Sequence, residues 1–145
     1  MLNEKVRTFL LEKKWLDSGK NPQYDKVMME LNVPMDSDFG EFHRFTTEIS
    51  FVGIGPELWN ICWFSLNTGD FASLRKFYCE NRPWGVLPSN FIPCSAYAGE
   101  SILLYDTISQ GVYYVNEREI NEMIAGNFTA QWRSFNEFLE HYFNI

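Results

Sequence analysis

The sequence predicts an α+β fold in which a central, mainly antiparallel sheet is flanked by N-terminal and C-terminal helices. Three observations lead to this prediction. Apolar residues recur at helical spacing up to Phe45, short apolar runs separated by Gly and Pro follow Pro83, and a Ser-x-x-Glu signature begins at Ser134. Because two separate cores would each be small, the 145 residues are expected to form a single domain, 1–145.

The N-terminal third of the chain predicts three helices. From Glu4 to Leu16, apolar residues recur at helical spacing between Lys and Glu, as in an amphipathic helix. Turn residues fill 17–22, a second helix is expected from Tyr24 to Leu31, and Pro34 is expected to stop it. A third helix should begin near Phe39, because the Asp-Ser-Asp run before it offers capping oxygens and negative charge.

The middle of the chain predicts strands and then a helix. Residues 48–52 alternate polar and apolar side chains, which suits a half-buried strand, and the glycines and proline of 53–56 are expected to end it. These glycines do not indicate a nucleotide site, because no third glycine or basic residue is placed to hold phosphate. A second short strand is expected around 58–64. A helix should open at Thr68 and Asp70, with one apolar stripe made of Phe71, Leu74, Phe77 and Tyr78.

The last third predicts three short strands and a closing helix. The strands are expected at 90–92, 101–105 and 112–115, and the last two should form a hairpin joined through 106–111. Ser134 and Glu137 form the Ser-x-x-Glu pattern of a capping box. The helix that follows should bury one aromatic and aliphatic stripe, which consists of Phe135, Phe138, Leu139, Tyr142 and Phe143.

Charge gives the first indication of function. The chain has 12 Lys plus Arg against 19 Asp plus Glu, a formal net charge of −7. Nucleic-acid binding draws most of its affinity from Lys and Arg, so direct binding of nucleic acid is disfavoured. A basic protein would instead be attracted and steered toward this surface. The alternative is that the acidic surface only keeps the protein in solution.

The chemistry-bearing residues predict no catalytic, metal or cofactor site. Cys62, Cys79 and Cys94 are an odd number without CxxC spacing, so neither disulfides nor zinc are expected, and the thiols should be buried. His43 and His141 lack partners at metal-ligand spacing, and nothing in the sequence supports a Cys–His nucleophilic pair. No signal peptide or membrane span is recognised, which predicts a cytoplasmic protein that does not bind membranes.

Two acidic clusters each admit two interpretations. Glu117, Glu119 and Glu122 would suit acid and base catalysis if their pKa values diverged, but a solvated surface explains them more simply. Asp36, Asp38 and Glu41 lie where acids cap a helix and offset its dipole, or where they would bind a partner.

Since no nucleophile, base, metal or cofactor signature is recognised in the chain, the sequence favours a binding protein over an enzyme.

The order of short motifs resembles the SUKH superfamily, which includes the fungal Smi and Knr cell-wall regulators and many bacterial immunity proteins. The matching pieces are Val33-Pro34, Asp38-Phe39, Trp84-Gly85, Leu87-Pro88, Asn90-Phe91-Ile92, Ala98-Gly99-Glu100, Leu104-Tyr105-Asp106, Gly111-Val112-Tyr113, Trp132, Ser134-Phe135 and Phe138-Leu139. The chain departs from the family where Ser101 follows Glu100, since the family often has Gly there, and where Thr46-Thr47-Glu48 replaces a frequent Asn-Gly.

The resemblance implies an immunity protein without enzymatic activity that binds and neutralises a cognate toxin, as in contact-dependent growth inhibition systems. The chain itself is expected to be a monomer or weak dimer. The toxin would be a nuclease or deaminase domain, and charge complementarity predicts that it is basic. Acids beside turns or helix starts are the expected contacts, because such positions should be exposed and rigid: Asp36, Asp38, Glu41, Asp70, Glu100 and Asp106. Trp59 and Trp84 are candidate aromatic anchors, with core packing as the alternative for each.

Two other function classes remain open at this point. One is an intracellular regulatory or scaffold module that acts without a toxin, as the fungal relatives in the superfamily suggest. The other is a small enzyme or ligand-binding domain, which would need a deep pocket that holds a glutamate cluster with strongly shifted pKa values.

Overall fold

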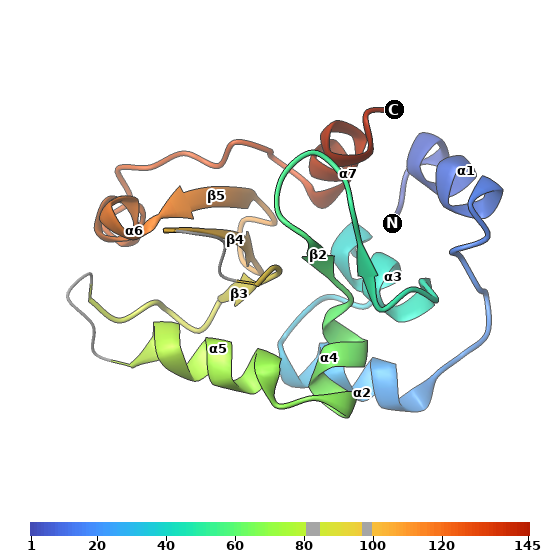
Figure 1. Cartoon of the computed structure of the whole chain (residues 1–145), viewed down its shortest axis with the longest axis horizontal. Helices are drawn as coiled ribbons and strands as arrows, with labels where there is room; N and C mark the ends of the chain where they lie inside the picture. The colour runs from blue at the N-terminus through green and yellow to red at the C-terminus, as the bar shows by residue number, and fades with distance from the viewer. Residues whose placement is uncertain (81–84, 97–99) are drawn as a thin grey trace.

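The computed structural model describes residues 1–80, 85–96 and 100–145, and this part of the chain contains seven helices and five strands (Figure 1). The helices are α1 (Glu4–Glu12), α2 (Pro22–Glu30), α3 (Asp38–Phe45), α4 (Ile61–Asn67), α5 (Asp70–Cys79), α6 (Glu117–Ile124) and α7 (Phe135–Phe143). The strands are β1 (Ser50–Phe51), β2 (Leu58–Trp59), β3 (Phe91–Pro93), β4 (Ser101–Asp106) and β5 (Val112–Asn116). The predicted α+β class is confirmed.

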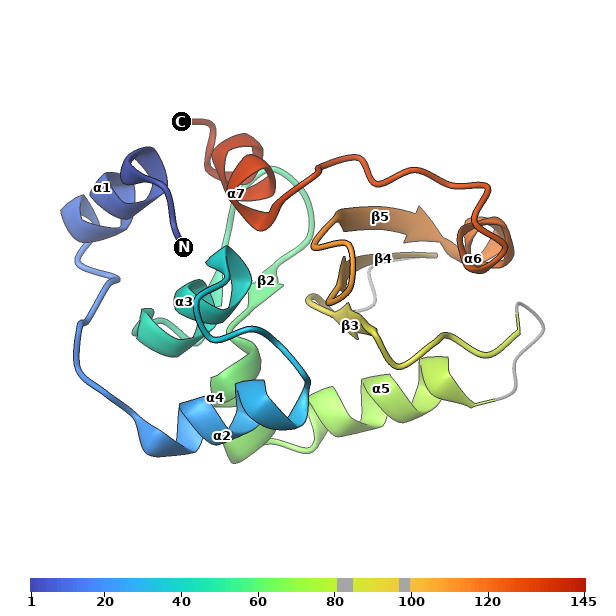
Figure 2. The same cartoon turned by 180° about the vertical axis from the view of Figure 1, so that it is seen from behind.

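The strands form two small antiparallel sheets rather than one central sheet. β3, β4 and β5 pair in that order, and β4 and β5 form the predicted hairpin, while β1 and β2 pair only with each other. An isolated bridge between Leu58 and Ser95 links β2 to the chain just after β3. Figures 1 and 2 show the three-stranded sheet at one end of the molecule, beside α5 and α6, and α1 at the other end, with α3 and α7 between them.

Strand β4 separates two apolar clusters. Leu103 and Tyr105 belong to the larger cluster, which the helices α1, α2, α3, α4 and α7 and the β1–β2 hairpin fill. Ile102 and Leu104 belong to the smaller cluster, together with Tyr78 of α5 and residues of α6. Because successive side chains of a strand point to opposite faces, one strand supplies both interiors.

Residues in left-handed conformations follow two helices and correct the expected helix ends. α1 ends at Glu12 instead of Leu16, and Lys14 follows it with φ of 60°. Asn32 has φ of 57° after α2, and the amides of Asn32 and Val33 donate to carbonyls of the last turn, 3.0 Å away in each case. This is a Schellman-type ending, so Asn32 rather than Pro34 stops α2.

Two further segments correct the predicted elements. The strand expected around 58–64 ends at Trp59, because the side-chain oxygen of Asn60 accepts a hydrogen bond from Trp63 N and caps α4 instead. Glu117, Glu119 and Glu122 lie on helix α6, which the sequence did not predict, and none of the three is buried. Asn116 and Glu119 form its reciprocal capping box.

The capping box expected at the start of α7 is half confirmed. Ser134 Oγ accepts from Glu137 N, as the pattern predicts. The Glu137 carboxylate accepts instead from the backbone and side chain of Arg133, and these hydrogen bonds lower its pKa.

All three cysteines are free, with Cys62 and Cys94 buried and Cys79 partly exposed.

The loop between β1 and β2, residues 52–57, is fixed to α7 by a single residue, Tyr142, through its side chain and its carbonyl, and we call these contacts the Tyr142 anchor. Tyr142 Oη lies 2.7 Å from the carbonyl oxygens of both Phe51 and Pro56, and it accepts a hydrogen bond from Leu58 N. Ile54 N donates to the Tyr142 carbonyl oxygen at 2.8 Å. Both ends and the middle of the loop are therefore held on one helix, beside which the loop lies in Figure 1.

Candidate functional site

Half of the acids predicted for an exposed binding surface are buried. Asp38, Glu41 and Asp106 have exposed fractions of 5%, 8% and 7%. The expectation that they are exposed is wrong, since each carboxylate accepts hydrogen bonds from its own chain. Burying a carboxylate costs free energy unless such partners satisfy it, so these three residues stabilise the fold.

Asp38 joins the starts of two helices. Its Oδ1 accepts from Phe39 N in α3, and its Oδ2 accepts from Asn136 N in the first turn of α7 at 2.8 Å. Each helix start has unsatisfied amides and a positive dipole end, so one carboxylate stabilises both. Sequence reasoning had recognised only the local half of this role.

Removing this charge tests the assignment. We expect Asp38→Asn to lower the free energy of unfolding by about 1–3 kcal/mol, because an amide offers one acceptor where two donors converge. Asp36→Asn, at an exposed carboxylate two positions earlier, should change it by less than about 0.5 kcal/mol. Urea denaturation of both variants measures the difference, and equal losses would contradict the structural role of Asp38.

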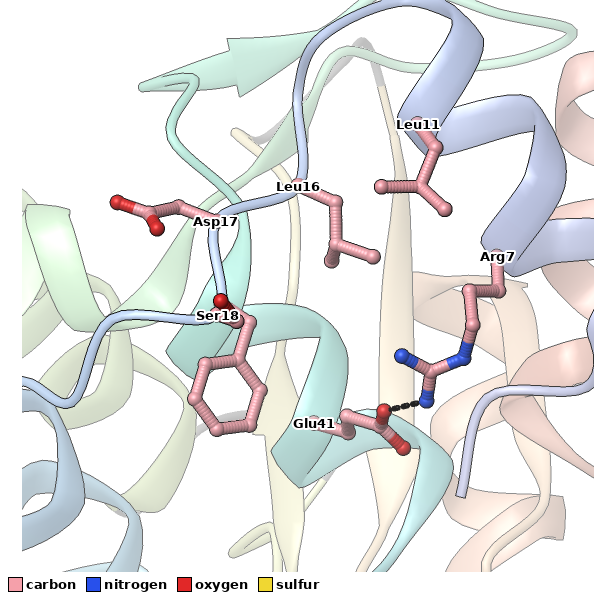
Figure 3. A pocket seen from close by; sticks show the side chains of 7 residues that line it. Arg7, Leu11, Leu16, Asp17, Ser18 and Glu41 are labelled. Atoms are coloured by element: carbon pink, nitrogen blue, oxygen red, sulfur yellow. Dashed lines mark hydrogen bonds and ion pairs between the residues drawn. The ribbon is translucent and has the colours of Figure 1, made fainter.

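Glu41 lies at the side of a hollow of about 320 Å³ between α1, α3 and residues 16–18. Its carboxylate accepts from the Arg7 side chain, across the hollow, and from Leu2 N at 2.8 Å. Figure 3 shows Arg7 reaching from α1 to Glu41, with Leu11 and Leu16 lining the same hollow. The charge of Glu41 is thus already neutralised within the chain.

Asp106 organises the turn between β4 and β5. Its Oδ1 accepts from Asn90 Nδ2 at 2.7 Å and from Ile108 N, and its Oδ2 accepts from Ser109 Oγ. An Asp that binds the backbone two residues ahead is typical of a turn. The strand-ending acid that the SUKH resemblance emphasised therefore fixes the local backbone.

The other predicted contact residues divide between the surface and the interior. Asp36, Asp70 and Glu100 are exposed, as predicted. Trp59 is buried and stacks on Phe64 of α4, with ring centroids 4.3 Å apart, which favours the packing alternative. Trp84 lies outside the residues that the structure describes.

Trp59 and Asp70 nevertheless meet at one hollow, which we call the Trp59 groove. It measures about 370 Å³, and its lining is mainly apolar. The lining residues come from β2, α5 and the chain after β3: Trp59, Asp70, Ser73, Leu74, Phe77 and Ala96. These two residues are the only predicted anchor and predicted acid that share a hollow among those described here.

A second concave region surrounds Phe45 at the end of α3. Phe45 lines the hollow of Figure 3 and two more, of about 390 and 220 Å³. Arg44 lies over the Phe45 ring, 4.8 Å from its centroid, and its Nε is 2.7 Å from Asp25 Oδ1. Arg7 is likewise paired with Glu41, so both basic side chains of this region are bound to acids of the chain.

The residues with potential for nucleophilic chemistry are buried in unreactive states. His43 Nδ1 accepts from Ile61 N at 3.1 Å, and burial lowers its pKa to about 3. Burial raises the pKa of Cys62 to about 12 and also raises that of Cys94. A thiol with a raised pKa is a poor nucleophile, so neither thiol forms an activated pair with this imidazole.

No group of three or more His, Cys, Asp and Glu side chains in 1–80, 85–96 and 100–145 is arranged to hold a metal ion. None of the helices in this part of the chain combines the length and apolarity of a membrane span. The hollows described above are not lined by the glutamates of α6.

One surface feature escaped the residue-by-residue reading of the sequence. No Lys, Arg or His occurs from 45 to 74, a segment that contains the β1–β2 hairpin and α4 and that carries Glu48, Glu57 and Asp70. Its exposed large apolar residues are Ile49, Val52, Ile54 and Leu66. The gap in basic residues is visible in the sequence and could have identified this surface, whereas the exposure of the apolar side chains could not be predicted.

Two comparisons of this chain with known proteins give no match. Models of known protein families give no match to it, and a search of curated proteins gives none either. The SUKH resemblance therefore stays a prediction based on the short motifs.

Proposed function

We propose that this chain is an immunity protein that binds a basic bacterial toxin domain, such as a nuclease, and neutralises it in a one-to-one complex. The toxin's active site or its substrate-binding surface is covered in that complex. The observation that carries this proposal is the 45–74 segment, where acids and exposed apolar side chains occur together without a basic residue. The net charge of −7 and the resemblance to the SUKH superfamily support the same function.

The physical argument joins charge and apolar area. A nuclease holds phosphate with Lys and Arg, so the same residues attract an acidic protein at long range. Charge speeds the encounter, but tight binding also needs apolar groups that lose water at the centre of the interface. The 45–74 segment offers both features, while the Phe45 region places the basic residues Arg7 and Arg44 around its hollows, each paired with an acid of the chain.

Co-expression tests the proposal. The probe is a basic toxin domain encoded in a gene that neighbours the gene of this chain, produced from an inducible promoter with and without the chain. We expect growth to be rescued only when the chain is present, and we expect the two proteins to co-purify at a one-to-one ratio. Raising the salt concentration should slow association, because it screens the attraction between the two surfaces.

Two results would contradict the proposal. In the first, the toxin domain kills cells equally well with the chain present and does not bind it. In the second, the purified chain converts a metabolite without any partner. A chain that binds only a non-toxic host protein would support the regulatory alternative instead.

A further inference from the structure

The loop 52–57 of the β1–β2 hairpin, which we call the hairpin loop, exposes apolar side chains. Val52 is 82% exposed and Ile54 is 52% exposed, and Ile49 just before β1 is also exposed. Single exposed apolar residues are ordinary on protein surfaces. Three within six positions of one hairpin are a local concentration that a contact partner would explain.

The hairpin loop is rigid, which distinguishes it from a mobile loop with apolar residues. The Tyr142 anchor holds the carbonyls of Phe51 and Pro56, the amide of Leu58 and the amide of Ile54. Gly53 lies so close to α7 that a Cβ there would be 2.6 Å from Tyr142 Cδ1. A loop fixed before binding loses little conformational entropy in a complex, so more of its contact energy contributes to affinity.

Along the chain, the charged side chains of the hairpin and its flanks, from 45 to 74, have one sign. Glu57 in the loop is exposed and Glu48 before β1 is half-buried, and neither is among the acids with an ion-pair partner in the described residues. The nearest basic residues along the chain are Arg44 and Arg75, and Arg44 is already paired with Asp25. A basic surface is therefore the complementary partner for this hairpin.

We propose that the hairpin loop is the element that enters the partner, placing Val52 and Ile54 in an apolar pocket whose rim carries Lys or Arg facing Glu57. The partner is the basic toxin domain, so this inference rests on the proposed function. The rim cations would be those that hold phosphate in the toxin's substrate. The loop would then occupy the substrate path rather than a distant surface.

A matched site elsewhere in the chain provides the control. Ile108 is 79% exposed at the tip of the β4–β5 turn, where its neighbours Thr107 and Ser109 are polar and uncharged. Replacing an exposed Ile by Ser at either tip should leave the fold intact. A difference in toxin binding between the two tips thus reports the interface and not stability.

The experiment measures affinity for the catalytic domain of the toxin encoded next to the gene. We expect the double variant Val52→Ser/Ile54→Ser to weaken binding at least about 100-fold and Ile108→Ser to weaken it less than about 3-fold. Glu57→Gln should slow association at low salt, whereas Glu12→Gln on α1 should not. Thermal melting of each variant checks that the fold is retained.

A second measurement locates the contact directly. A photoreactive benzophenone amino acid at position 52 should cross-link to the toxin domain, while the same group at position 108 should not. If the parent chain binds the toxin and the double variant binds equally well, the hairpin inference is wrong and the proposed function stands. If the parent chain neither binds nor protects, the proposed function fails, and the inference fails with it.

Discussion

Replacing Gly53 by alanine is expected to lower the free energy of unfolding by about 2–3 kcal/mol. A Cβ at this position would meet the carbonyl oxygen and ring of Tyr142, and that carbonyl is held by the amide of Ile54. The carbonyl oxygen and the ring of Tyr142 cannot move away without breaking the Tyr142 anchor. The added methyl group would therefore overpack this contact. Urea denaturation of the purified variant measures the loss.

Gly69 provides the control for this prediction. A Cβ at Gly69 would have no atom within 4 Å, and its φ of −90° suits any residue. Gly69→Ala should therefore change the stability by less than about 1 kcal/mol, including the small cost of alanine at a helix N-cap. Similar losses for Gly53→Ala and Gly69→Ala would show that contact with Tyr142 is unimportant.

Acidification is expected to destabilise the protein through His43. The imidazole is fully buried against the rings of Phe39, Phe42 and Phe135, and burial lowers its pKa from 6.5 to about 3. Below pH 6.5 His43 is protonated in the unfolded chain but stays neutral in the folded chain. The free energy of unfolding therefore falls as the pH falls, until about pH 3. The expected loss between pH 8 and pH 5 is about 2 kcal/mol from this residue.

The variant His43→Asn isolates the effect of the titrating group. The Asn side-chain oxygen can replace Nδ1 as the acceptor for Ile61 N, but it does not titrate. The variant should be less stable at pH 8 because of lost volume, yet it should lose about 2 kcal/mol less than the parent between pH 8 and pH 5. An unchanged slope in His43→Asn would contradict the assignment.

Local signals in the sequence predicted much of the secondary structure. The stripe of α5, the hairpin of β4 and β5, and the start of α7 at Ser134 follow from periodicity and capping, which depend on neighbours within a few residues. The end of α2 did not follow, because Asn32 adopts a left-handed conformation that competes with the more obvious stop at Pro34. α4 was missed because a short apolar run reads equally well as a strand or a helix.

The candidate contact residues were harder to predict, because burial of an acid depends on distant partners. Asp38 is buried by a contact with Asn136, which lies 98 positions away, and Glu41 is buried by Leu2 and Arg7. A capping acid and a binding acid look alike in sequence, so only the fold separates Asp38 from Asp36. The exposed apolar residues of the hairpin loop were also not predictable, since Val52 reads as the last residue of a strand and Ile54 as part of the turn that ends it.

The shared strand β4 has a consequence for how the molecule comes apart. One face of β4 packs against the larger apolar cluster and the other face packs against the smaller one. If either cluster loses its packing, β4 is disturbed, and the other cluster loses one of its sides. Melting should consequently occur in one cooperative step, and a cavity made at Leu103 or Leu104 would be felt at both ends of the molecule.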